Sequence, residues 1–504
     1  MKAYEELMTK AKDIEVLDSS IGIVNWDLET YMPPSGIQLR SEQLSLLDRL
    51  SHEMISSPQI GDLLNEVRKS LDAMSEVQRR NIHLLQRDHD IATRIPAELV
   101  GRLSKQKAIA TDIWKKAKTA KDWKMFEPEL KKLVELSRER EEIAMEVKGI
   151  DSLYDSMLDD FERGLSADVV SKVFRQLRDR LVPLAERCAE PSKDVSRSFL
   201  SKRVPIDVQT RIAVDIGNLI GYDTTSDTAR GRIDPTEHPF TTGYFDDVRV
   251  TLHYYENNVS AMIYAMLHEG GHALYEQNLN REFMYQPVGT AASFGIHESM
   301  SRFYENMIGR TPEFWGYYLP RLNEITSGTF ADVDQGEFVK GTTLVRPSKV
   351  RIEADEVTYS LHIIIRFEIE RELLAEKLTV SELPQVWNEK YEKYLGVQVK
   401  HDGEGVLQDT HWGSGLYGYF PSYALGNVYD GQWALKLGKD VPDWGKSVSE
   451  GDLDPVNRWL VDNIQSKGAL YDPEDLVKLI TGNQLDARPF LDYLERKYSR
   501  LLAL

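Results

Sequence analysis

The residues whose types and spacing can do chemistry lie between Ala265 and Tyr275. His268 and His272 are four positions apart, and Glu269 follows the first of them directly. Residues four apart on an α-helix lie on one face, one turn from each other. Both imidazoles can then reach one zinc ion, with Glu269 beside it as a potential general base. Histidine makes up only 11 of 504 residues, so a chance H-E-x-x-H match is expected at roughly the per-cent level.

The helical interpretation of this stretch rests on its apolar spacing. Four apolar residues recur at helical intervals, namely Ile263, Met266, Leu267 and Leu274. Two adjacent glycines, Gly270 and Gly271, oppose it, because each costs about 1 kcal/mol relative to alanine in a helix interior. We therefore expect something to approach this helix closely. The part that packs against these glycines could be the substrate groove or a small sheet.

A catalytic zinc site needs a third protein ligand and an open position for water. Glu298 is the best candidate, since the intervening chain is long enough for the first helix to end and a second to begin. Glu276 lies on the first helix and Glu282 falls in the loop. Glu305, two turns beyond Glu298, is placed to orient a histidine from outside the ligand set. Such a His2Glu site with Glu269 could activate water for attack on a carbonyl.

Composition sets the class of protein. The 504 residues are enough for a large core and two or more lobes. A formal charge of −19 argues against nucleic acid and anionic membrane surfaces as partners. Cys188 is the only cysteine, which excludes an internal disulfide and fits a reducing compartment. No apolar run approaches the roughly 20 residues of a membrane span, so we expect a cytoplasmic protein.

The chain is predicted to be mainly α with a minor sheet. Charged amphipathic helices fill the first 230 residues or so. Asp247–His253 alternates polar and apolar residues, which predicts a strand just before the histidine helix. Residues 345–377 are predicted to form one long helix. Its polar stripe contains Arg351, Asp355 and His362, and a solvated face with an i,i+4 ion pair is the alternative interpretation of that stripe.

Six motifs occur in a fixed order along the chain. They are His238-Pro239-Phe240, Asp247-x-Arg249-x-Thr251, His268-Glu269-x-x-His272, His297-Glu298-Ser299, Val350-Arg351-x-x-Ala354-Asp355 and Gly405-x-x-Gln408-Asp409-x-His411-Trp412. With these motifs the sequence resembles, over nearly its whole length, the thermostable carboxypeptidases typified by carboxypeptidase Taq. Met300 stands where a glutamine is frequent in that family. This departure affects a local contact and no zinc ligand.

The resemblance implies a mainly helical, neurolysin-like fold with a deep groove and a small sheet beside the active-site helix. Residues 1–504 would form one peptidase unit of two helical lobes, with the active-site motifs in 234–423. It implies a homodimer that removes C-terminal amino acids from peptides with broad side-chain acceptance, using zinc or sometimes cobalt. By motif match, the ligands are His268, His272 and Glu298, and the general base is Glu269.

Two further residues resemble the oxyanion donors of related groove peptidases. They are His411 and Tyr423; charge developing on a tetrahedral intermediate needs such preorganised donors. For Tyr423 the alternative is a core tyrosine behind Pro421, and Tyr419 is its rival for the role.

An exopeptidase must also bind a free carboxylate, for which arginine offers a bidentate fork. Arg351 is the first candidate and Arg249 the second, and His238 is expected to help line the end of the groove. Asp355 and Asp247 share motifs with these arginines. Both arginines could therefore be structural ion-pair partners instead.

Two other functions compete with the carboxypeptidase. The same fold and zinc chemistry would also suit an oligo-endopeptidase. A helical scaffold with structural zinc or none is disfavoured, because structural sites are closed by four protein ligands, often cysteines. The single cysteine, Cys188, is remote from the motif.

Overall fold

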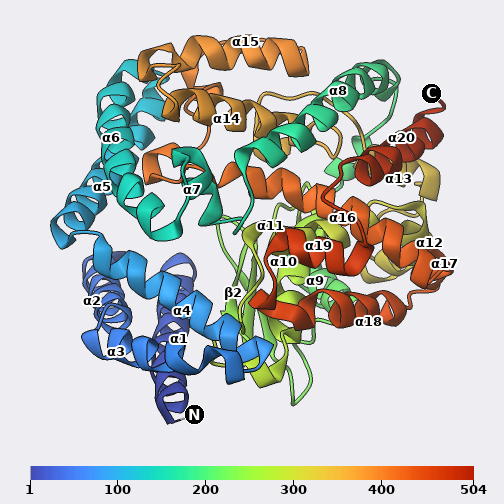
Figure 1. The fold of residues 1–504 in the computed structure, drawn as a ribbon. Coiled ribbons are helices and arrows are strands. Elements are labelled where there is room, and N and C mark those ends of the chain that lie inside the picture. The colour runs from blue at the N-terminus through green and yellow to red at the C-terminus, as the bar shows by residue number, and fades with distance from the viewer. Residues whose placement is uncertain (1) are drawn as a thin grey trace.

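The computed structural model describes residues 2–504, and its helices fall into three groups (Figure 1). The first group, in blue at the lower left, begins the chain and has a small core of its own contributed by α1, α3 and α4. Its members are α1 (Lys2–Glu29), α2 (Ile37–Ile55), α3 (Pro58–Val67) and α4 (Glu76–Arg94).

The second group forms the upper part of the molecule in Figure 1 and joins segments far apart in sequence. Here α14 packs on α8 and α15, and α5 packs along α6. Its members are α5 (Ala97–Ala120), α6 (Trp123–Lys148), α7 (Leu153–Asp159), α8 (Ala167–Ser192), α14 (Tyr359–Leu374) and α15 (Leu383–Leu395).

The third group fills the centre and right of the view. It shares with the second group one large core that runs from Ala110 to Tyr498. None of the helices in residues 2–504 combines the length and apolarity needed to span a bilayer. The members are α9 (Ile206–Ile220), α10 (Val259–Asn278), α11 (Phe294–Arg302), α12 (Pro312–Ile325), α13 (Gln335–Thr342), α16 (Phe420–Asp440), α17 (Trp444–Ser449), α18 (Asp454–Asn463), α19 (Pro473–Thr481) and α20 (Arg488–Leu502).

A three-stranded sheet packs against α10. Its order is β1 (Gly231–Pro235), β3 (Asp247–Leu252), β2 (Phe240–Tyr244), with β1 parallel and β2 antiparallel to β3. The apolar face of β3 is fully buried and consists of Val248, Val250 and Leu252. Gly243 has φ +133°, and a Cβ there would lie 2.1 Å from the Asp247 carbonyl oxygen, so the β2–β3 hairpin requires glycine. The predicted mainly α fold with a small sheet beside the histidine helix is confirmed.

The two glycines of α10 mark its closest helix contacts. A Cβ on Gly271 would lie 2.4 Å from the Met300 carbonyl oxygen and 2.8 Å from the Ser301 Cα of α11. A Cβ on Gly270 would lie 2.4 Å from Cδ1 of Ile220 on α9. Close packing is therefore the reason for the glycine pair, as expected. The packing partners, however, are two helices rather than the groove or the sheet.

The prediction of one long helix over 345–377 is wrong. Only Tyr359–Leu374 is α-helical, and a short 3-10 turn covers Arg351–Glu353. Asp355 Oδ1 accepts hydrogen bonds of 3.0 Å from the backbone N–H groups of residues 357 and 358. The side chain thus competes for the backbone as aspartates do before a helix. Arg351 and His362 are buried, so the solvated polar face is wrong as well.

Replacing Gly271 by alanine should destabilise the protein by about 1–3 kcal/mol, because the new Cβ meets backbone atoms that cannot move aside. Gly270→Ala is the matched control. Its Cβ meets side-chain atoms of Ile220 and Met266 and no backbone atom, and alanine restores helix propensity. Thermal unfolding of both variants measures the difference. Equal stability of G271A and the wild type would contradict the backbone contact.

Candidate active site

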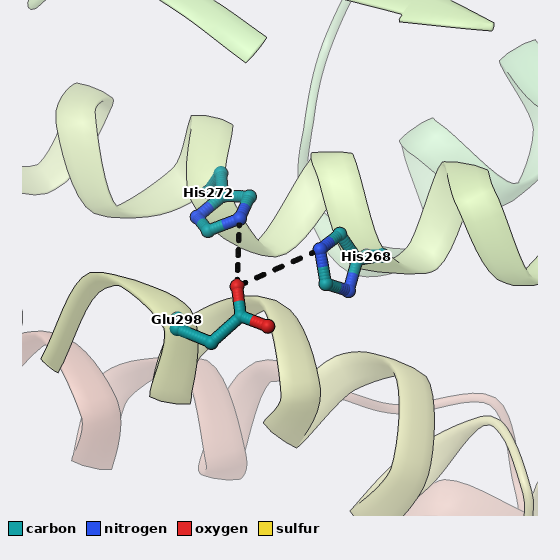
Figure 2. A group of neighbouring side chains, drawn as sticks. All are labelled: His268, His272 and Glu298. Carbon is teal, nitrogen blue, oxygen red and sulfur yellow. Dashed lines mark ion pairs between the residues drawn. The ribbon is translucent and has the colours of Figure 1, made fainter. Parts of the chain in front are cut away.

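Three side chains converge between α10 and α11 (Figure 2). His268 and His272 point from α10 toward Glu298 on α11. Glu298 Oε2 lies 3.7 Å from His268 Nε2 and 3.4 Å from His272 Nε2. One ligand atom from each residue lies within 4.8 Å of the others. Ligands of a tetrahedral zinc ion, bound at 2.0–2.2 Å, are roughly 3.4 Å apart. The residues therefore fit one such ion, and the third ligand predicted from sequence lies with the first two.

Buried contacts fix the carboxylate of Glu298. Arg302 Nε donates to its Oε1 at 2.7 Å, and Ser301 Oγ donates to Oε2 at 3.1 Å. Burial alone would raise the pKa of Glu298. The charges of Arg302 and His268 outweigh burial and hold that pKa well below its usual range. Glu298 is thus ionised and aimed, as a metal ligand must be.

Glu305 orients His268, as predicted. It lies in a π-helical segment, Phe303–Ile308, that continues α11. Its Oε2 lies 3.0 Å from His268 Nδ1, which leaves Nε2 for an ion. Arg310 Nη2 donates to Glu305 Oε1 at 2.8 Å. Burial lowers the pKa of His268, but Glu298 and the hydrogen bond to Glu305 together raise it above the ordinary histidine value.

His272 is oriented by a second histidine, which the sequence reasoning missed. His272 Nδ1 and His297 Nδ1 are 2.5 Å apart, and His297 Nε2 lies 2.7 Å from Glu276 Oε1. With the His297 proton on Nε2, the ring accepts from His272 and donates to Glu276. Burial lowers the pKa of His272 to about 3, so it is neutral at neutral pH. The sequence feature that could have indicated this role is the position of His297 directly before the predicted ligand Glu298.

The sheet positions Glu269. Thr241 Oγ1, on β2, lies 2.7 Å from Glu269 Oε2 and 2.9 Å from the Glu269 carbonyl oxygen. Burial raises the pKa of Glu269, and His268 and the Thr241 hydrogen bond offset part of that rise. A buried carboxylate with a raised pKa is a better proton acceptor than a free one. Sequence reasoning did not identify Thr241.

Two cavities meet at these residues. The first has a volume of about 1110 Å³ and the second about 650 Å³. Both are lined by His268, Glu269, Glu298 and Tyr423. The lining extends from Asp159 to Tyr498, so residues outside the motif segment 234–423 also shape the site. Two candidate metal ligands, His268 and Glu298, are therefore shared by both cavities, and His272 lines the second.

His411 and Tyr423 are neighbours. His411 Nε2 lies 3.4 Å from the Tyr423 hydroxyl, and only Tyr423 lines the cavities. Burial lowers the pKa of His411 to about 4, and burial raises that of Tyr423, so both are neutral hydrogen-bonding groups at neutral pH. Tyr423 lines both cavities, whereas its rival Tyr419 lines only the second. Of the two tyrosines, Tyr423 is therefore the one that both cavities share.

Arg351 lines the first cavity and is 7% exposed. Its Nε and Nη2 donate to Asp409 Oδ1 at 3.1 and 2.9 Å, and Arg366 Nε donates to Asp409 Oδ2 at 2.6 Å. Two guanidinium groups thus share one carboxylate, which leaves one positive charge in excess. The expected alternative partner, Asp355, instead accepts from backbone N–H groups.

Arg249 and His238 are placed less favourably than Arg351 for binding a substrate carboxylate. The Arg249 guanidinium donates to both oxygens of Asp247 at 2.8 and 2.7 Å and lies over the Trp26 ring. Of the two cavities, Arg249 and His238 line neither. His238 is exposed, and its neighbour Pro239 lines both cavities. Arg249 therefore has the structural ion pair that was the alternative to carboxylate binding.

Three candidate metal ligands, with a buried carboxylate beside them and two adjoining cavities, are the arrangement expected of a metallopeptidase. A family model described as carboxypeptidase Taq (M32) metallopeptidase matches residues 6–498. The chain belongs to that family and is a metallocarboxypeptidase. Membership supports the exopeptidase over the oligo-endopeptidase alternative.

Curated relatives and solved structures agree with this assignment. Thermostable carboxypeptidase 1 of Thermus thermophilus is 36% identical, with 99% of each chain covered. Carboxypeptidase 1 of Bacillus subtilis is 35% identical, again with 99% of each chain covered. The crystal structure of the M32 carboxypeptidase from Deinococcus radiodurans superimposes with a TM-score of 0.96 at 33% identity and covers 100% of both chains.

Metal affinity should fall in weak acid, because the candidate ligand His268 can bind a metal ion only when it is neutral. The raised pKa of His268 places this loss at higher pH than for an ordinary histidine. The pKa values of His272 and Glu298 are lowered, so neither residue takes up a proton in weak acid and neither contributes to this loss of affinity. Glu305→Gln should shift the loss to lower pH while weakening binding at pH 8 by about 10–100-fold. Chelator competition across pH measures both. An identical pH profile for E305Q and wild type would refute the role of Glu305.

Proposed function

We propose that the protein is a zinc metallocarboxypeptidase that hydrolyses the C-terminal bond of peptides with broad side-chain acceptance. One observation carries the proposal. Glu269 and the candidate ligands His268 and Glu298 line both cavities, while Arg351, with excess positive charge, lines only the first. A peptide crossing from the second cavity into the first would place its scissile bond at Glu269 and its terminal carboxylate near Arg351.

His268, His272 and Glu298 would hold the zinc ion, for which cobalt can substitute. When bound, such an ion lowers the pKa of water and polarises a carbonyl oxygen. Glu269 then takes the proton of the attacking water and passes it to the leaving amine. Its burial and the hydrogen bond from Thr241 support this role. The two cavities would keep the substrate extended on either side of Glu269.

Tyr423 and His411 are assigned to the oxyanion. Charge that develops on the carbonyl oxygen is best stabilised by donors already in place. Tyr423 lines both cavities, and its hydroxyl lies 3.4 Å from His411 Nε2. Tyr423 is thus the direct donor, and His411 orients its hydroxyl.

Carboxylate recognition is assigned to Arg351. Its guanidinium shares Asp409 with Arg366, so the substrate carboxylate would neutralise the remaining charge. Arg249 is the second candidate and His238 a residue at the end of the groove. The ion pair of Arg249 with Asp247 makes its role in binding secondary.

An exposed apolar helix face supports a homodimer. Helix α2 buries none of its residues in this chain and exposes Ile37, Leu39, Leu46 and Leu50, a face that a second copy would cover in a homodimer. Light scattering that gave a monomer at micromolar concentration would contradict the homodimer.

The lone cysteine supports a cytoplasmic location. We further propose one peptidase unit of two lobes over 1–504, with the motifs in 234–423.

Glu269→Gln should keep zinc but lower kcat by about 10²–10⁴-fold, because glutamine occupies the same space and cannot accept the proton. Metal analysis and turnover of an N-blocked dipeptide measure the two effects. Glu282→Gln, an acid in the loop outside both cavities, is the matched control. Near-normal kcat in E269Q with zinc bound would exclude Glu269 as the base.

An N-blocked dipeptide should lose its C-terminal residue, whereas its C-terminal amide should resist hydrolysis. Arg351→Lys should lower kcat/KM for the free acid by about 10–100-fold, the value of a lost charged hydrogen bond. Arg249→Lys should have a smaller effect. Equal cleavage of acid and amide, or internal fragments from a longer peptide, would favour the oligo-endopeptidase. A larger effect of R249K would reverse the order of the arginines.

A further inference from the structure

Three aromatic rings form one wall of the second cavity, and we call them the aromatic wall. Phe161 follows α7, Phe294 is the first residue of α11 and Tyr419 directly precedes α16. Their centroids are 5.5 Å apart for Phe161–Phe294, 5.0 Å for Phe161–Tyr419 and 5.6 Å for Phe294–Tyr419. All three pairs are edge-to-face, with interplanar angles of 74–79°. Such pairs favour each other beyond simple burial.

The backbone behind the aromatic wall is fixed by a buried carboxylate. The Phe294 N–H donates to the Phe161 carbonyl oxygen at 3.1 Å. Glu162, fully buried, accepts from Ser293 Oγ at 2.9 Å and from the Gly295 N–H. These contacts join the segment after α7 to the first turn of α11. The wall is therefore held in place before any ligand binds.

The wall faces the cavity rather than the core. Phe294 is 51% exposed, although the next two residues of α11 are buried. A large apolar side chain left in water forgoes favourable burial, and such surface in a cavity is typical of a binding site. Phe240 of β2 lines the same cavity together with the candidate metal ligands. An apolar group bound here would lie beside the reacting bond.

The two cavities give the bound peptide a direction. Arg351 lines the first cavity only, and the aromatic wall lines the second only. With the terminal carboxylate at Arg351, the C-terminal residue occupies the first cavity, and the residue before the scissile bond occupies the second. This step rests on the proposed function.

We propose that the aromatic wall is the subsite for the penultimate residue of the substrate and that it selects aromatic or large aliphatic side chains there. The nearby acidic groups are already paired, since Arg87 lies 2.6 Å from Asp159 and Lys148 lies 2.6 Å from Asp160. Arg163 is the basic residue that lines this cavity; its Nη1 lies 3.9 Å from Asp472 Oδ1, and its Nε and Nη1 have no hydrogen-bond partner among residues 2–504. An acidic penultimate residue is therefore the competing ligand.

Two series of N-blocked dipeptides test the proposal. One keeps C-terminal alanine and places Phe, Leu, Gly or Glu before it, and the other keeps penultimate glycine and varies the C-terminal residue. The expected kcat/KM is higher for penultimate Phe than for Gly by at least tenfold. Phe294→Ala should reduce this ratio to below about threefold, and Phe294→Leu should retain part of it. Ile352→Ala, a matched apolar truncation in the first cavity, should leave the ratio unchanged.

Four results would contradict a penultimate-residue subsite at the aromatic wall. A wild-type ratio near one, a preference for Glu over Phe, or a ratio unaffected by F294A in a protein of normal melting temperature would overturn the proposal. So would an effect of F294A on the C-terminal series instead of the penultimate series. In all these cases release of the C-terminal residue would continue, and the proposed function would stand. If no peptide in either series lost its C-terminal residue, the proposed function itself would fail.

Discussion

The close contact between α10 and α11 is the constraint on which the rest of the site depends. With no side chain at Gly271, the backbone of α11 approaches α10 so closely that a Cβ there would overlap the Met300 carbonyl oxygen. That approach places Glu298 Oε2 3.4 Å from His272 Nε2. A wider helix spacing would leave two histidines without their third partner. Ligand geometry is in this sense a consequence of helix packing.

The buried charges around Glu298 are arranged in alternating sign. Arg302 lies between the carboxylates of Glu298 and Glu305, and Arg310 binds the far oxygen of Glu305. Burying a carboxylate is costly unless it is paired and hydrogen-bonded. Here each acid has both, so the two carboxylates keep their charge and hold their direction. Arg302 thus orients the candidate ligand Glu298 directly and the His268 ring through Glu305.

The site differs on its two sides. The first cavity is lined by Arg351, whose guanidinium shares the carboxylate of Asp409 with that of Arg366. The second brings together aromatic rings held by buried hydrogen bonds. Glu269 and Tyr423 belong to both. This difference between the two cavities suits the binding of a chain end. A free terminus carries a charge that must be recognised on one side of the scissile bond, whereas an internal segment carries no such charge on either side.

The sequence by itself determined the local features: the histidine spacing on a helix, the alternating strand Asp247–Leu252 and Glu298 as the candidate third ligand. These follow from short-range periodicity and from metal chemistry, which a single sequence displays. It could not show that His297 and Glu276 complete the support of His272, or that Thr241 reaches Glu269. Nor could it separate Arg351 from Arg249 or foresee that Asp355 would interrupt the helix predicted over 345–377. Those outcomes depend on which distant segments meet and on which charges are already paired, and only the packing of the whole chain decides that.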